Sequence, residues 1–242
     1  EGLGLELLGA LAPAGTPWHY PLCDAHRRCF VGYLQGQIGG QRALGFLRTV
    51  MDSLDDMGLE RPANSLGHMS RSTKWLVVRG CHCSYKYGGV CLPAAPFPRW
   101  MEEVLAVCMP LCGLVERSSW PNSCNVNVYA DGSDGIDWHA DDEPLFQGYE
   151  RDCRIISLSL GEERTFEVRL SEGDAGQAGG SACRLRLASG DLCTMEGMTQ
   201  KYYVHGVPKE RDAAVGPRVN LTWRWIRRHG RGCPLAEGEP HF

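Results

Sequence analysis

Short runs of alternating hydrophobic and polar residues, separated by turn residues, fill the second half of the chain. These runs lie at 125–129, 154–160, 164–170, 183–187, 192–195, 201–205 and 219–226. A period of two is typical of half-buried strands, and many short strands in succession favour a sandwich or a barrel. The glycine-rich segment 171–181 has few apolar residues and predicts a long surface loop between two of these strands.

Helical spacing is found in the first half of the chain instead. Apolar side chains recur every three or four residues over 41–59, where Gly58 is a suitable helix end. A second helix is predicted from Pro98, which suits a first turn, to the region of Pro110. A strand is predicted between the two helices at 74–78. We therefore expect a mainly β fold with flanking helices, of the α+β class.

Opposite faces of the strand at 218–225 differ in polarity. The polar face carries Arg218, Asn220, Thr222 and Arg224, and the other face is apolar. A polar face in solvent is common in antiparallel sheets and accounts for the pattern without any function. Alternatively, this face lines the interior of a barrel, where two buried guanidiniums require an anion such as a dicarboxylate. The strand at 125–129 divides in the same way, with Asn125, Asn127 and Tyr129 on one face.

A histidine and a carboxylate two residues apart follow that strand. His139 and Asp141 point the same way in an extended chain, and His205 lies at the end of a later run. The preceding turn at 131–135 lacks the ligand spacing of an EF-hand loop, which argues against calcium. Two histidines and one carboxylate form the facial triad of non-haem Fe(II) oxygenases, which leaves positions open for O2 and a co-substrate. This order of motifs indicates an iron site that takes an anionic co-substrate.

Together these motifs resemble the AlkB family of Fe(II)- and 2-oxoglutarate-dependent dioxygenases, over about residues 75–227. The resemblance is carried by Asn127-Val128-Tyr129, His139-Ala140-Asp141-Asp142-Glu143, His205 and the Arg-x-Asn-x-Thr-x-Arg strand at 218–224. It implies a double-stranded β-helix, or jelly-roll barrel, whose interior holds Fe(II) and 2-oxoglutarate and uses O2. The iron ligands that it implies are His139, Asp141 and His205.

The resemblance also assigns the residues that bind the co-substrate. It implies that Arg218, with Tyr129 and Asn127, binds the distal carboxylate of 2-oxoglutarate. Arg224 is expected near the metal-chelating end of the same molecule. The residues expected to complete the polar wall are Asn220 and Thr222.

On the substrate side, the resemblance implies oxidative demethylation of N-alkylated bases, such as 1-methyladenine and 3-methylcytosine, in DNA or RNA. The products are succinate, CO2 and formaldehyde, and a base has to leave a duplex to reach the iron. Tyr85 and Tyr87 match a substrate lid, and Glu143 matches an acid that contacts the base. An ordinary hairpin for the tyrosines and a solvated loop for Glu143 are the alternatives. The alternative functions are oxidation of a protein or small molecule by the same iron site, or a catalytically silent binding module.

Length and composition agree with a globular protein. The 242 residues suit one large domain, or one domain with a small appendage. We expect a helical extension at residues 1–70 that packs on a dioxygenase domain at 71–242. The net charge of −4 means that affinity for nucleic acid has to come from a local basic surface. No apolar run reaches the roughly 20 residues of a membrane span. We expect a monomer without membrane contact, in the nucleus or cytoplasm.

The number and spacing of the cysteines predict neither a disulfide scaffold nor a zinc site. Twelve cysteines are too sparse for a disulfide scaffold of this length, so reduced intracellular thiols are expected. Cys81 and Cys83 flank His82, and Cys108 and Cys112 lie four apart on the second predicted helix. Neither pair has the C-x2-C spacing of a zinc finger. We interpret all four as buried small hydrophobic residues rather than as metal ligands.

Overall fold

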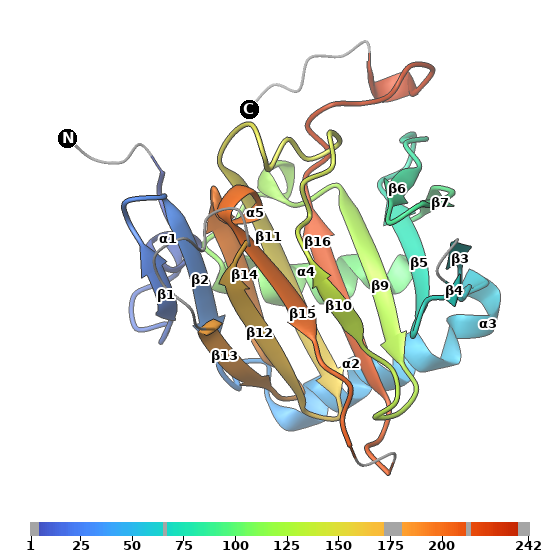
Figure 1. Cartoon of the computed structure of the whole chain (residues 1–242), viewed down its shortest axis with the longest axis horizontal. Helices are drawn as coiled ribbons and strands as arrows, with labels where there is room; N and C mark the ends of the chain where they lie inside the picture. Colours follow the sequence, from blue (N-terminus) through green and yellow to red (C-terminus); the bar gives the residue numbers. More distant parts are fainter. Residues whose placement is uncertain (1–4, 65–66, 172–180, 212–213, 237–242) are drawn as a thin grey trace.

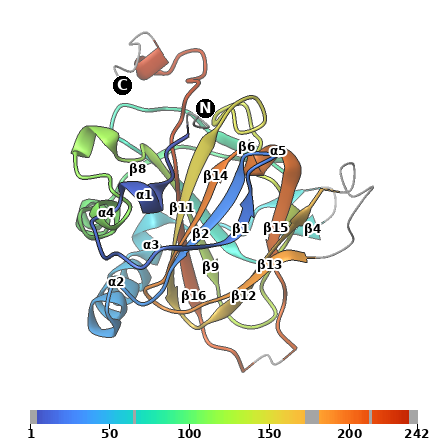
Figure 2. The ribbon, with the colours of Figure 1, turned by 90° about the vertical axis from the view of Figure 1, so that its left-hand side faces the viewer.

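Two β-sheets face each other, and the longer helices lie along the outer side of the larger sheet (Figure 1, Figure 2). The computed structural model of the chain describes residues 5–64, 67–171, 181–211 and 214–236. This layering confirms the jelly roll expected from the sequence, although the two sheets do not close into a barrel. Within the described ranges, no helix combines the length and the apolar character that crossing a membrane requires.

The larger sheet has eight strands in the order β1-β2-β14-β11-β16-β9-β5-β8. Their bounds are His19–Asp24 (β1), Cys29–Leu34 (β2), Leu192–Gly197 (β14), Cys153–Gly161 (β11), Arg218–Arg224 (β16), Ser123–Tyr129 (β9), Ser72–Val77 (β5) and Ala95–Pro96 (β8). The smaller sheet has the order β10-β15-β12-β13, with bounds Ile136–His139, Tyr203–Val207, Arg164–Leu170 and Ser181–Leu187. Two short hairpins add Ala63–Asn64 (β3) with Gly67–His68 (β4), and Tyr85–Tyr87 (β6) with Val90–Leu92 (β7).

The longer helices, α2 (Gly40–Asp52) and α4 (Arg99–Leu111), cover one face of the larger sheet (Figure 2). The shorter helices are Leu8–Leu11 (α1), Leu54–Met57 (α3) and Thr199–Tyr202 (α5), with 3-10 turns at Arg117–Ser119 (η1) and Pro234–Ala236 (η2). The helix expected at 41–59 is therefore confirmed, with an interruption at Ser53, and the left-handed Gly58 (φ 58°) ends it. The helix expected from Pro98 is confirmed by α4.

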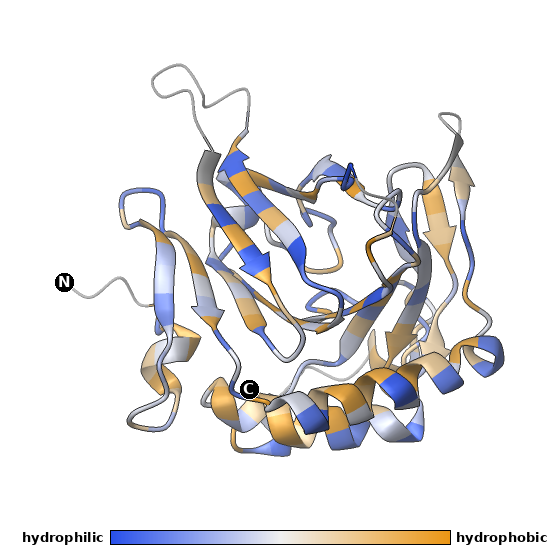
Figure 3. Ribbon diagram, turned by 90° about the horizontal axis from the view of Figure 1, so that it is seen from below, coloured by the Kyte–Doolittle hydropathy of each residue, from blue (hydrophilic) through white to orange (hydrophobic). Residues whose placement is uncertain are grey.

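The apolar face of β16 packs against these helices. Trp223 and Leu221 are fully buried in the same cluster as Met101 of α4, and the Trp223 indole N–H donates to the Met101 sulfur at 3.2 Å. Burying a large apolar side chain contributes about 1.5–3 kcal/mol. Figure 3 shows hydrophobic and hydrophilic residues alternating along the strands above the helices. Because alternate side chains point to opposite faces, this packing turns the polar face of β16 toward the smaller sheet.

The structure corrects two sequence-based expectations. The first 70 residues are not a purely helical extension, because β1 and β2 join the larger sheet beside β14. Every residue of β2 is buried, so this strand lacks the alternation by which the other strands were found. The run 201–205 begins as helix α5 rather than as a strand, since the Thr199 hydroxyl donates to the Glu196 carbonyl at 2.6 Å and turns the chain. Most of the loop expected at 171–181 lies outside the described residues.

Candidate active site

The three expected iron ligands meet between the two sheets. Antiparallel pairing of β10 with β15 places His139 directly opposite His205, with ring centroids 4.2 Å apart. Asp141 follows β10 by two residues, and the ligand atoms of the three side chains all lie within 4.8 Å of one another. Gly206 permits this approach, since a Cβ there would lie 3.0 Å from the Ile136 carbonyl oxygen. The strand register therefore assembles a facial set of two imidazoles and one carboxylate.

The surroundings of both histidines favour the neutral imidazole. The Nδ1 atom of His139 donates to the Asp137 carbonyl at 2.8 Å, which leaves Nε2 with its lone pair toward the cavity. Burial lowers the pKa of His139, and burial together with His139 lowers that of His205 to about 3. A neutral imidazole is the form that binds a metal.

Asp141 is held ionised by its neighbours. Its Oδ2 atom accepts a hydrogen bond from Arg224 Nη2 at 2.6 Å, and its Oδ1 accepts one from the Tyr85 hydroxyl at 3.3 Å. Its backbone N–H donates to Gln200 Oε1 at 2.9 Å. Burial opposes ionisation of Asp141, but the Arg224 charge and the two histidines hold its pKa below the ordinary range. The carboxylate is thus charged and fixed in orientation.

A buried guanidinium marks the far end of the same cavity. Arg218 lies opposite Tyr129 in the β16–β9 register, with its guanidinium 5.1 Å from the tyrosine ring centroid. Its Nη2 donates to Ser159 Oγ at 2.9 Å, whereas Nε and Nη1 find no hydrogen-bond partner among the described residues. Unpaired buried N–H groups are costly, and a carboxylate fits a guanidinium fork. The residues present therefore fit the distal carboxylate of 2-oxoglutarate.

Amide and hydroxyl groups form the wall between the two ends. Asn127 and Asn220 lie opposite each other in the register. The Asn220 amide donates to Ser157 Oγ at 2.6 Å, and Thr222 Oγ1 donates to Asn220 Oδ1 at 2.6 Å. Asn127 Oδ1 accepts from Arg71 Nε at 2.8 Å, so the Asn127 amide nitrogen is the group left to donate. The polar face of β16 is thus buried inside the fold, as the barrel hypothesis expected.

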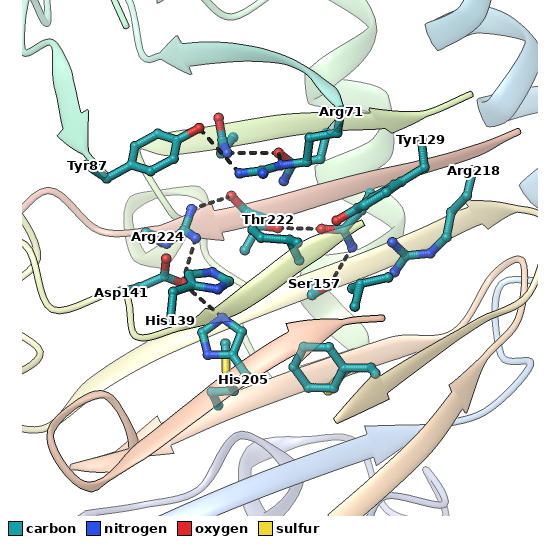
Figure 4. A pocket seen from close by; sticks show the side chains of 18 of the residues that line it. Arg71, Tyr87, Tyr129, His139, Asp141, Ser157, His205, Arg218, Thr222 and Arg224 are labelled. Atoms are coloured by element: carbon teal, nitrogen blue, oxygen red, sulfur yellow. Dashed lines mark hydrogen bonds and ion pairs between the residues drawn. The ribbon is translucent and has the colours of Figure 1, made fainter. Parts of the chain in front are cut away.

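The cavity gathers the expected metal and co-substrate residues in one place (Figure 4). The expected metal and co-substrate residues that line the cavity are Asn127, Tyr129, His139, Asp141, His205, Arg218, Asn220, Thr222 and Arg224. Tyr85 and Tyr87 also line it, and their ring centroids are 4.5 Å apart. Glu143 does not line this cavity.

Glu143 instead lines a hollow that adjoins the cavity at His139, Arg71 and Tyr87. Burial and the Asp141 charge raise the pKa of Glu143 to about 8, and its Oε2 has no hydrogen-bond partner among the described residues. Trp138 is 38% exposed in the same hollow, with the Arg169 guanidinium 4.2 Å from its ring centroid. The hollow therefore offers an aromatic surface and a carboxyl group beside the iron ligands.

Arg71 was not predicted as a site residue from the sequence, and the structure gives it a role in the site. The side chain is buried, bonds to Asn127, and donates from Nη2 to the Tyr87 hydroxyl at 3.4 Å. Arg71 thereby links the co-substrate wall to the hairpin β6–β7. It precedes β5 without any local motif, so no pattern in the sequence distinguishes it from a surface arginine.

The family model for the 2OG-Fe(II) oxygenase superfamily matches residues 47–224, and the chain belongs to that superfamily. Among curated proteins, alpha-ketoglutarate-dependent dioxygenase alkB homolog 3 of Mus musculus is 38% identical over 145 residues, which cover 57% of this chain and 48% of that protein. DNA oxidative demethylase ALKBH2 of Arabidopsis thaliana is 37% identical over 122 residues, which cover 43% of this chain and 38% of that protein. Within the superfamily, the chain is a member of the AlkB family. The matches span about half, or less, of these relatives' lengths.

Solved structures agree on the fold. The structure of OsALKBH1 superposes with a TM-score of 0.55 at 18% identity, over 81% of this chain and 96% of that one. A prolyl hydroxylase from Trichoplax adhaerens, solved with a peptide fragment, gives a TM-score of 0.51 at 10% identity, over 81% and 83%. The superfamily uses Fe(II), 2-oxoglutarate and O2, which agrees with the ligand set and the unpaired Arg218 donors described above.

Proposed function

We propose that this chain oxidatively demethylates N-alkylated bases in DNA or RNA. The observation that carries the proposal is the position of the hollow lined by Trp138, Tyr87 and Glu143, which shares His139 with the cavity between the sheets. When bound by His139, Asp141 and His205, Fe(II) with 2-oxoglutarate and O2 supplies oxidation of a C–H bond, coupled to formation of succinate and CO2.

The chain's own residues orient the co-substrate in this proposal. Arg218 binds the distal carboxylate through its two unpaired nitrogens, Nε and Nη1, beside Tyr129. Arg224 stays on Asp141 and provides positive charge near the metal-chelating end. Asn127, Asn220 and Thr222 form the polar wall beside the co-substrate, and hydrogen bonds to one another or to neighbouring side chains hold them in place.

The hollow takes the methylated base. A base that leaves the helical stack needs an aromatic surface and polar groups on its edge. Trp138 and Tyr87 provide the surface, and Glu143 provides a carboxyl group for the polar edge of the base. Tyr85 is buried under Tyr87 and contacts Asp141, so we assign it the positioning of the metal ligand along with support of the lid.

The test is release of both succinate and formaldehyde from 2-oxoglutarate and Fe(II), with single-stranded and duplex DNA and RNA that carry 1-methyladenine or 3-methylcytosine. Asp141→Ala is the control that removes the metal ligand. Both products with one of these oligonucleotides would support the proposal and rank DNA against RNA. Succinate without formaldehyde, whichever oligonucleotide is added, would overturn the choice of substrate and favour a protein or a small molecule. If the metal-bound protein releases neither succinate nor formaldehyde with any of these substrates, the result would favour a binding module.

A further inference from the structure

A second cluster of metal-binding side chains lies outside the cavity. Cys81 and Cys83 belong to the connection between β5 and β6, whereas His229 and Cys233 follow β16. The ligand atoms of all four lie within 4.8 Å of one another, although 148 residues separate Cys81 from His229. The C-terminal segment reaches this position by running past the end of the larger sheet, where β6 and β7 lie (Figure 1).

The distances within this cluster match a tetrahedron around one ion. Nδ1 of His229 lies 3.7, 3.4 and 3.3 Å from the sulfurs of Cys81, Cys83 and Cys233. The sulfurs of Cys81 and Cys233 are 3.9 Å apart. Zinc–sulfur bonds of about 2.3 Å and zinc–nitrogen bonds of about 2.0–2.1 Å give tetrahedral edges of about 3.8 Å between sulfurs and about 3.6 Å between nitrogen and sulfur.

We propose that Cys81, Cys83, His229 and Cys233 bind a structural zinc ion. Three thiolates and one imidazole are a ligand set that selects zinc by softness and by tetrahedral geometry. Four protein ligands close the coordination sphere, so this ion has no position for a substrate and differs in role from the metal of the cavity.

The surroundings of the sulfurs suit thiolates. The three cysteines are buried, and backbone N–H groups of His82 and Gly230 donate to the sulfurs of Cys233 and Cys83, both at 3.4 Å. Gly232 has φ 80°, which turns the chain so that Cys233 returns to His229.

A disulfide does not account for the cluster. All twelve cysteines are free, and the 3.9 Å between the sulfurs of Cys81 and Cys233 exceeds the about 2.05 Å of a disulfide bond. Such a bond would also leave the convergence of Cys83 and His229 unexplained.

The site joins the C-terminal segment to the hairpin of β6 and β7, which carries the lid residues Tyr85 and Tyr87. Cys83 lies two residues before Tyr85, and its carbonyl accepts a hydrogen bond from the Trp75 indole at 2.8 Å. Cys81, Cys83, Tyr85 and Cys233 share one buried cluster with Trp75. Loss of zinc is therefore expected to loosen β6 and β7, while β9 in the centre of the larger sheet keeps its packing.

The first experiment measures zinc in the full chain, purified without a chelating column, by mass spectrometry of the metal. We expect about one zinc per chain, retained when His139→Ala and Asp141→Ala together remove the ligands of the cavity. Cys83→Ser and Cys233→Ser should lose zinc. Cys91→Ser is the matched control, because Cys91 is an exposed cysteine on β7 outside the cluster. Zinc below about 0.1 per chain after growth with added zinc, or full zinc content in Cys83→Ser, would overturn the proposal.

A second measurement uses the unmodified chain, in case the cysteine variants do not fold. Cobalt replaces zinc, and tetrahedral cobalt with thiolate ligands shows sulfur-to-metal charge-transfer absorption that the His139–Asp141–His205 set cannot give. We expect this absorption, and faster deuterium exchange over 79–92 than over β9 after the metal is removed with a chelator. Absence of the charge-transfer band would refute the site, and unchanged exchange over 79–92 would refute its role in holding the lid.

Discussion

Arg224 and Asp141 form a buried ion pair, with Nη2 of the arginine 2.6 Å from Oδ2 of the aspartate and side chains 5% and 2% exposed. The Arg224 guanidinium balances the negative charge of Asp141 when no metal is bound, and the Tyr85 hydroxyl donates a second hydrogen bond to the same carboxylate. A buried charge that loses its partner is strongly destabilising. The stability of the fold and the affinity for metal are therefore linked through one side chain.

This link can be measured with Arg224→Met. The substitution leaves Asp141 buried without a compensating charge, which costs about 3–5 kcal/mol of unfolding free energy in the metal-free protein. Mn(II) supplies the missing positive charge, so we expect it to stabilise the variant more than the parent in urea denaturation. Arg117→Met changes an exposed arginine on η1 and serves as the control. Equal stabilisation by Mn(II) in parent and Arg224→Met would contradict the link.

Arg218→Ala separates co-substrate binding from metal binding. Removing the guanidinium deletes the charge-assisted contacts to the distal carboxylate, and we expect affinity for 2-oxoglutarate to fall by about 30–1,000-fold, or about 2–4 kcal/mol. Mn(II) affinity should stay unchanged, because Arg218 contacts Ser159 and Tyr129 rather than the ligand set. Calorimetric titration of both ligands measures the two effects. Unchanged 2-oxoglutarate affinity would contradict the assignment of the distal carboxylate to Arg218.

Tyr85→Phe removes the hydroxyl that donates to Asp141 while preserving the ring. Burial and the Asp141 charge raise the pKa of Tyr85, so the hydroxyl remains protonated and acts only as a donor. Groups that orient a metal ligand typically contribute 10–100-fold to metal affinity, and we expect a loss within about that range for Fe(II) or Mn(II). Tyr149→Phe, at an exposed tyrosine, is the matched control. Identical metal affinity in the two variants would show that the 3.3 Å contact does not orient Asp141.

Acid should weaken the attachment of β1 through Asp24. Burial opposes ionisation of this carboxyl, but hydrogen bonds from the Arg27 backbone, the Tyr203 hydroxyl and the Arg27 side chain hold its pKa below the ordinary value. A carboxyl with a lowered folded-state pKa stabilises the protein above its unfolded pKa, and this stabilisation disappears as pH falls through the folded pKa.

Asp24→Asn should therefore be less stable than the parent near neutral pH, and the difference should shrink below about pH 4. Urea denaturation at several pH values measures this. Glu103→Gln, at an exposed carboxylate on α4, should show no such pH-dependent difference. A stability difference for Asp24→Asn that grows toward low pH would contradict the assignment.

Local sequence patterns determined which side chains share a strand face and where the longer helices lie. The alternation at 218–224 fixes which side chains of β16 share a face, because side chains along a strand point alternately to opposite sides. The same period makes His139 and Asp141 point together. Helical spacing located α2 and α4, and the family resemblance supplied the ligand set that the cavity then brought together.

Only the tertiary structure decided how residues distant in the sequence combine. β2 is buried along its whole length and carries no alternation, so its place in the sheet depends on pairing with β14. Arg71, which precedes β5, acquires its role by contact with Asn127 of β9. Cys81 and Cys83 look like small buried residues until the fold brings His229 and Cys233 to them from the other end of the chain. Sequence periodicity reports the faces of single elements, whereas such contacts arise from the packing of elements against one another.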